Sequence, residues 1–97
     1  MITVLQHNCG ITIQGHANYA PRGQDIVCAA VSTLVHTLIA SIEELTADTI
    51  EYDIQPGWVD IKHGNLSGCA QALVDSFFIG INMIADDYPD YVRTTKH

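Results

Sequence analysis

A histidine and a cysteine flank a short loop in the segment GHANYAPRGQDIVCAAVS, residues 15–32, and together they could do covalent chemistry. A cysteine thiolate attacks carbonyl carbons, and an imidazole within reach can hold the thiolate and then donate a proton to a leaving amine. His16 and Cys28 are therefore a candidate pair for nucleophilic catalysis on a peptide bond. The same two residue types also bind zinc, so a metal site is the competing chemical hypothesis.

The residues that follow Asp25 predict a helix with Cys28 in its first turn. Apolar residues recur at intervals of three and four from Val27 to Leu45, which is typical of an amphipathic helix, and the pattern stops near Thr46. Asp25 suits the N-cap position, where its carboxylate would accept the N–H of Cys28. The first turn lies at the positive end of the helix dipole, which favours a thiolate, and its backbone N–H groups could form an oxyanion hole.

His16 is predicted to lie at the end of a strand, at the same edge of the sheet as the helix start. Residues 11–14 alternate apolar and polar side chains, as a strand with one buried face does. Residues 17–23 contain Asn, Pro and Gly and indicate a loop. About ten extended residues cover roughly 33 Å, so this loop is long enough to bring His16 to Cys28.

Each of these residues also has a purely structural interpretation. A cysteine in an apolar stretch is often a small core residue, and Asp25 could act as a helix cap and nothing more. Ser32, one turn after Cys28, could bond a backbone carbonyl of the helix, and His16 could be a solvated turn residue. Taken alone, one histidine and one cysteine favour these structural interpretations over catalysis.

No zinc site and no cofactor are predicted. Structural zinc sites usually combine two closely spaced pairs of ligands. This chain has one close pair, His7 and Cys9, which could lie near His16 on the predicted hairpin. The full set of histidine and cysteine candidates is His7, Cys9, His16, Cys28, His36, His63 and Cys69.

The composition narrows the possible partners and the compartment. A net charge of −7, with only four Lys and Arg side chains, argues against a nucleic-acid partner and against an anionic membrane surface, and would attract a basic partner. Three cysteines without a CxxC spacing indicate reduced thiols and a cytoplasmic location. No signal peptide and no clean membrane-spanning run are recognised, and the length suits one domain, residues 1–97.

Two hairpins are predicted from alternating strands joined by turn residues. Residues 2–6 and 11–14 form the first, with Gly10 able to take a positive φ in the connection. Residues 49–54 and 58–62 form the second, around a Pro-Gly turn. Each hairpin is expected to bury one face of its strands.

A second helix follows the second hairpin. Ser67 can cap it, its apolar residues again form one stripe, and Pro89 lies just beyond its expected end. The tail from Asp90 to His97 is expected to fray. The order β-β-α-β-β-α predicts an α+β two-layer sandwich, with two helices on an antiparallel or mixed sheet.

The spacing of glycine, histidine, aspartate and cysteine in residues 15–32 resembles the signature of the Prp family. These are bacterial ribosomal-processing cysteine proteases, also called YsxB-like proteins. The resemblance is carried by Gly15-His16-Ala17, by Gly23, and by the run DIVCAAVS from Asp25 to Ser32. It implies that Cys28 is the nucleophile, that His16 is its general acid/base, and that Asp25 and Ser32 support the site. It therefore places catalysis ahead of the structural interpretations.

The resemblance also implies a substrate, a moving part and an assembly. Prp proteins remove a short N-terminal extension from a large-subunit ribosomal protein, so a basic cytoplasmic partner is expected here. The loop from Ala17 to Gly23 is expected to be mobile and to close over a bound peptide, with Gly15 and Gly23 as hinges. A homodimer is expected, and Phe78 and Ile79, which fall off the main stripe of the second helix, are candidates for its surface.

A second function remains open on the residues. The chain could be a non-catalytic cytoplasmic module that binds a basic peptide of a ribosomal protein. In that case Cys28 would be no more reactive than Cys9 or Cys69.

Overall fold

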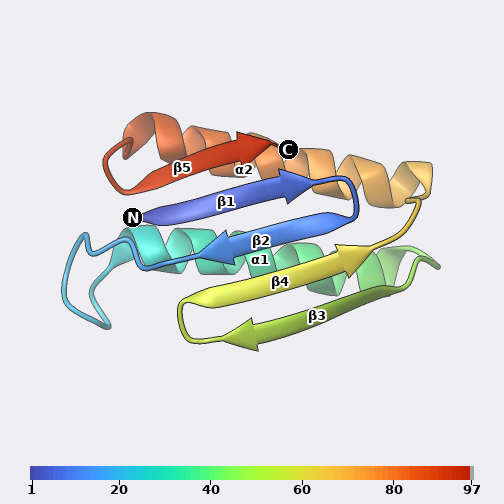
Figure 1. The fold of residues 1–97 in the computed structure, drawn as a ribbon, viewed down its shortest axis with the longest axis horizontal. Coiled ribbons are helices and arrows are strands. Elements are labelled where there is room, and N and C mark those ends of the chain that lie inside the picture. Colours follow the sequence, from blue (N-terminus) through green and yellow to red (C-terminus); the bar gives the residue numbers. More distant parts are fainter. Residues whose placement is uncertain (97) are drawn as a thin grey trace.

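The chain forms one five-stranded mixed sheet with two helices (Figure 1). The structure is a computed structural model and describes residues 1–96. The strands occur in the order β3-β4-β2-β1-β5, and β5 is parallel to β1 while all other neighbours are antiparallel. In chain order the elements are β1 (Ile2–His7), β2 (Gly10–Gln14), α1 (Ile26–Leu45), β3 (Ile50–Gln55), β4 (Trp58–His63), α2 (Gly68–Asp87) and β5 (Val92–Lys96).

Both helices cover the same face of the sheet, and the other face is left open (Figure 1). This follows from the alternation of the strands, because successive side chains of a strand point to opposite faces. Ile2 and Val4 of β1, Ile11 and Ile13 of β2, and Ile61 of β4 are all buried beneath the helices. The predicted α+β two-layer sandwich is therefore confirmed, with one more strand than expected.

The extra strand corrects the prediction for the C-terminal tail. β5 pairs with β1 from Ile2↔Val92 to Gln6↔Lys96, and Val92 is 1% exposed. The sequence of β5 shows little alternation, so nothing local marks it as a strand. The ladder with β1 and the burial of Val92 in the core hold it in place, and both are contacts with distant parts of the chain. His97, the last residue of that tail, lies outside the described residues.

The two predicted hairpins are present, with two differences in detail. Gly10 does not take a positive φ but lies within β2, where a β-carbon would collide with the carbonyl oxygen of Ile61. Tyr52 and Ile54 share the helix-facing side of β3, as expected, yet remain 46% and 42% exposed. β3 is an edge strand, so the helices cover it only in part.

The helix boundaries agree with the predicted caps. The side chain of Ser67 accepts the N–H of Ala70 at the start of α2, and Thr46 ends α1. By length and composition alone, both helices would also be able to cross a membrane, contrary to expectation, but core helices of globular proteins share this property. Here their apolar stripes pack against the sheet and against each other.

Candidate active site

Cys28 lies in the first turn of α1, where Asp25 caps the helix as predicted. Asp25 Oδ1 accepts the N–H groups of Val27 at 3.0 Å and Cys28 at 2.9 Å. The bond from the Cys28 N–H is the main cause that holds the pKa of the Asp25 carboxyl below its ordinary value of 3.8, while burial acts in the opposite direction. The carboxylate is therefore charged at neutral pH and fixes the backbone that carries the thiol.

The second oxygen of the same carboxylate ties the loop to the helix. Asp25 Oδ2 accepts the N–H of Tyr19 at 3.0 Å, and this bond also lowers the pKa of Asp25. One side chain thus fixes both the start of α1 and the first part of the loop that follows His16. The sequence indicated the cap but not this second contact.

His16 directly follows β2 and Gly15, and its ring packs against the turn between β3 and β4. Gly57 has a φ of +72°, and a β-carbon there would lie 2.6 Å from His16 Nε2. The N–H of Gly15 donates to the carbonyl oxygen of Gly57 at 2.8 Å, which ties this turn to the end of β2. Gly57 is therefore a site residue that the sequence marked only as part of a turn.

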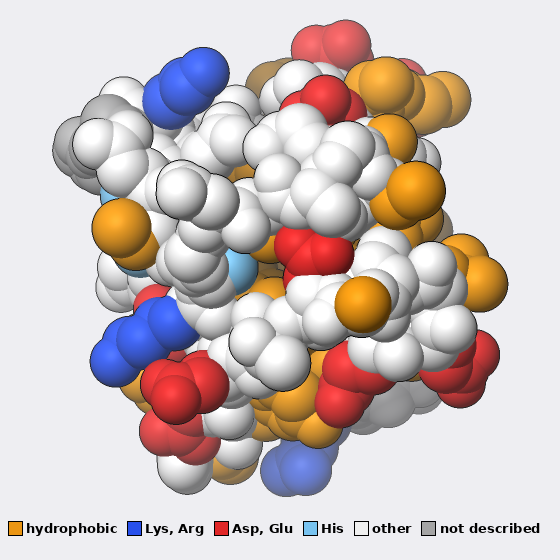
Figure 2. Space-filling model, turned by 90° about the vertical axis from the view of Figure 1, so that its right-hand side faces the viewer, with side chains coloured by type: hydrophobic (Ala, Val, Ile, Leu, Met, Phe, Trp, Pro, Cys, Tyr) orange, Lys and Arg blue, Asp and Glu red, His pale blue; other side chains and the backbone are white. Residues whose placement is uncertain are grey.

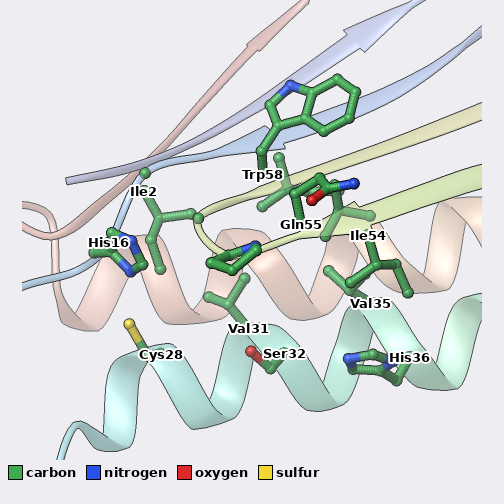
Figure 3. A pocket seen from close by; sticks show the side chains of 15 residues that line it. Ile2, His16, Cys28, Val31, Ser32, Val35, His36, Ile54, Gln55 and Trp58 are labelled. Carbon is green, nitrogen blue, oxygen red and sulfur yellow. The ribbon is translucent and has the colours of Figure 1, made fainter. Parts of the chain in front are cut away.

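His16 and Cys28 face the same space between the sheet edge and α1 (Figure 3). Both side chains line a cavity of about 280 Å³ and a second, larger one of about 790 Å³ under the loop. No hydrogen bond joins the His16 ring to a carboxylate within residues 1–96, so the described site is a pair rather than a triad. Catalytic hydrogen bonds are often long in unliganded sites and shorten when the substrate binds.

A backbone amide of the loop contacts the sulfur of Cys28. The N–H of Ala17 donates to Cys28 Sγ at 3.4 Å, and the Ala17 side chain is 2% exposed within the core. A donor at this position stabilises negative charge on the sulfur. Sequence reasoning did not identify this contact, because no side-chain chemistry marks a backbone N–H.

Most of the helix-start N–H groups expected to form an oxyanion hole are already engaged within the protein. The N–H groups of Val27 and Cys28 already bond Asp25 Oδ1, and the N–H of Ala29 bonds the carbonyl oxygen of Asp25 at 3.1 Å. The Asp25 cap thus occupies the Val27 and Cys28 N–H groups, which were predicted to bind a substrate oxygen. The Ala17 N–H is the backbone donor that lies at the sulfur instead.

A groove runs from Cys28 along α1 towards the β3–β4 hairpin. Ser32 and His36 follow Cys28 at successive turns of α1 and line the same cavity (Figure 3). Ser32 makes no bond to the helix backbone among the described residues, whereas the neighbouring Thr33 hydroxyl donates to the Ala29 carbonyl. The Ser32 hydroxyl is therefore free to contact a ligand.

The rest of the lining of this groove is largely apolar. Val31 and Val35 of α1 and Ile54 of β3 line the cavity, and Pro56 lines both cavities next to His16. Such a mixture of apolar walls with a few polar groups is typical of a ligand-binding cleft.

The two predicted hinge glycines have different surroundings. Gly23 has a φ of +88° and nothing within 4 Å of an added β-carbon, so this end of the loop has room to move. Gly15 has a φ of +95°, but its α-carbon packs against the carbonyl oxygen of Met1. Its surroundings suit a tightly packed strand end better than a hinge.

No three His, Cys, Asp or Glu side chains within residues 1–96 come together in a way that could hold a metal ion. The expectation that His7 and Cys9 could lie near His16 is wrong. His7 pairs with Gly10 at one end of the β1–β2 hairpin, and His16 follows Gln14 at the other end (Figure 1).

The whole chain is similar to proteins of known activity. The family model for the cysteine protease Prp matches residues 1–93. The ribosomal processing cysteine protease Prp of Bacillus subtilis is 29% identical over 101 residues, covering 94% of this chain and 90% of that protein. The protein of the same name from Staphylococcus aureus is 27% identical over 86 residues, covering 86% of this chain and 81% of its own length.

Solved structures agree with this match. The ribosomal processing protease Prp from Staphylococcus aureus, in complex with a covalently linked product peptide, superimposes with a TM-score of 0.95 over 100% of both chains at 23% identity. A crystal structure from Streptococcus mutans gives a TM-score of 0.78 at 28% identity and covers 98% of this chain and 90% of that one. The first likeness shows the shared fold, and the match of the family model over nearly the full chain shows that this protein belongs to the Prp family of cysteine proteases.

Proposed function

We propose that this protein is an endopeptidase that removes a short N-terminal extension from a large-subunit ribosomal protein, with residues 1–97 acting as one protease domain. The observation that carries the proposal is the placement of His16 and Cys28 on one cavity, with a loop amide at the sulfur. The relatives from Bacillus subtilis and Staphylococcus aureus bear the name ribosomal processing cysteine protease. A structure of the latter holds a substrate peptide.

In the proposed reaction the Cys28 thiolate attacks the carbonyl carbon of the scissile peptide bond. The C–N bond then breaks as the His16 imidazolium donates its proton to the leaving amine, which leaves a thioester on Cys28. Neutral His16 next takes a proton from a water molecule, whose oxygen attacks the thioester carbonyl. The C–S bond breaks, the carboxylic acid product departs, and the thiolate and imidazolium are restored.

The charge of the chain supports a basic substrate. The net charge is −7, and acidic side chains lie even on the end of the molecule remote from the Gly15–Gly23 loop (Figure 2). Opposite charges steer the encounter of two proteins and raise the association rate.

Ser32 and Asp25 support this site without taking part in bond making.

The direct test is cleavage of a synthetic peptide that spans the N-terminal extension of a large-subunit ribosomal protein, followed by mass spectrometry. Cys28→Ala should give no product, and His16→Ala should lower kcat by about 10²-fold or more. Cys69→Ala is the matched control, because Cys69 is an exposed cysteine at the start of α2. Undiminished cleavage by Cys28→Ala would contradict the mechanism. Binding of the peptide without cleavage by the unaltered protein would support a non-catalytic module instead.

We also propose that the protein works as a homodimer in the cytoplasm. Phe78 is partly buried and packs against the core, with its ring edge-on to Phe77 at 5.1 Å between centroids, so it is less exposed than expected. Ile79 and Met83, one turn apart on α2, are each 64% exposed and form a better candidate contact surface. Sedimentation of an Ile79→Asp, Met83→Asp double variant should show monomers where the unaltered chain shows dimers.

A further inference from the structure

Tyr19 anchors the loop at a point remote from its hinge. Its ring stacks edge-on against Tyr88 at 5.4 Å and against Tyr91 at 5.2 Å between ring centroids. Tyr88 is the C-cap residue of α2, and Tyr91 lies just before β5, so both belong to the folded body of the domain. Edge-to-face aromatic contacts are favourable and directional, so the Tyr19 ring is held in one orientation.

The backbone on either side of Tyr19 is fixed as well. The N–H of Tyr19 bonds Asp25 Oδ2, the side chain of Ala17 is buried, and Asn18 between them has a φ of +57°. A left-handed conformation is uncommon for a residue other than glycine and persists when its neighbours hold it. Residues 17–19 therefore form a short fixed segment, with its amide at Ala17 aimed at the sulfur of Cys28.

We propose that Tyr19, Tyr88 and Tyr91 form an aromatic clamp that positions the Ala17 N–H at the Cys28 sulfur and thereby activates the nucleophile. The proposal rests on the proposed function only in assigning Cys28 as the nucleophile. The three tyrosines are positioning residues, because they act through the backbone of residues 17–19 and do not line either cavity at Cys28. The moving part of the loop is then residues 21–23, which end at the unobstructed Gly23.

The same amide can serve the reaction after the attack begins. Negative charge leaves the sulfur and develops on the carbonyl oxygen of the substrate, and the N–H groups of Val27 and Cys28 are already engaged by Asp25. The Ala17 N–H, which is held at the sulfur, could then donate to that oxygen. Loss of the clamp should therefore lower kcat more than it changes KM.

The test compares Tyr19→Ala with Tyr19→Phe. Tyr19→Phe keeps the ring and should behave as the unaltered protein, while Tyr19→Ala should slow the alkylation of Cys28 by iodoacetamide about tenfold at neutral pH. Cys9 and Cys69 are exposed and serve as internal standards in the same digest, read by mass spectrometry. Tyr52→Ala is the matched control, since Tyr52 is 46% exposed against 41% for Tyr19 and lies on β3 away from the clamp.

Unchanged or faster alkylation of Cys28 in Tyr19→Ala would overturn the clamp. That result would mean that the loop restricts access to the thiol and does not activate it. Hydrogen exchange on the unaltered protein gives an independent measurement. The Ala17 and Tyr19 amides should be protected relative to those of Arg22 and Gly23, and equal exchange would also overturn the proposal. Both readouts need no ribosomal peptide, so failure of the clamp and failure of the proposed cleavage reaction are distinguishable.

Discussion

The imidazole of His16 lies directly against the α-carbon of Gly57, where no other residue type would fit without displacing the ring. A β-carbon at position 57 would come within 2.6 Å of Nε2, and the backbone there has a φ of +72°. Gly57→Ala should therefore move His16 away from Cys28 and lower kcat/KM by about 10²-fold, since a displacement of an ångström can cost that much. Peptide cleavage kinetics measure this effect.

Gly64→Ala is the control for that variant. Position 64 has no atom within 4 Å of an added β-carbon and no positive φ, so its kinetics should match those of the unaltered protein. Equal kcat/KM for both variants would show that the placement of His16 does not depend on Gly57.

Asp25 should make the stability of the protein depend on acid pH. Its pKa is lower in the folded state than its ordinary value of 3.8, so its stabilising contribution is complete above that pH and is lost as the pH falls through the lowered pKa. The difference in unfolding free energy between the unaltered protein and Asp25→Asn should shrink as the pH falls from 5 to 2. Urea denaturation at several pH values measures it, and a difference that stays constant would contradict the assignment.

Asp48 should behave in the same way at the start of the other helix. Its pKa is lowered by the hydroxyl and the N–H of Ser67, and Oδ2 accepts that N–H at 2.8 Å. Asp48→Asn should reduce stability above about pH 4 without changing the alkylation rate of Cys28, because Asp48 lies at the opposite end of α1. Parallel denaturation and alkylation experiments separate the two carboxylates.

The two glycines that flank the loop should respond differently to substitution. Gly15→Ala places a β-carbon against the Met1 carbonyl at a positive φ, so a stability loss of more than about 1 kcal/mol is expected. Gly23→Ala meets no neighbour and should lose less stability, but it should lower kcat by restricting the loop. Thermal denaturation and cleavage kinetics on the same samples compare them, and equal stability losses would argue against the different packing.

The parallel strand β5 should contribute to global stability. Val92 is 1% exposed, so Val92→Ala should cost about 2 kcal/mol through lost burial and the cavity that remains. Thr95→Ala, at an exposed position of the same strand, should be close to neutral. If both substitutions were neutral, the tail would be frayed after all.

The sequence by itself determined the local features of this protein. Apolar periodicity and capping residues act within a few residues of chain, which is why both hairpins, both helices and the Asp25 cap of Cys28 could be predicted from residue order. The spacing of His16 and Cys28 within residues 15–32 also indicated the family before any geometry was known.

Only the tertiary structure decided which distant groups meet. β5 pairs with β1 across ninety residues, the turn at Gly57 supports the ring of His16, and Tyr19 reaches Tyr88 and Tyr91. These contacts join segments far apart in the chain, and several of them use backbone groups that carry no residue-specific signal. Asp25 engages the N–H groups of Val27 and Cys28, which were expected to receive a substrate oxygen. The donor at the sulfur comes from the loop instead, because the burial of Ala17 and the contacts of Tyr19 place it there.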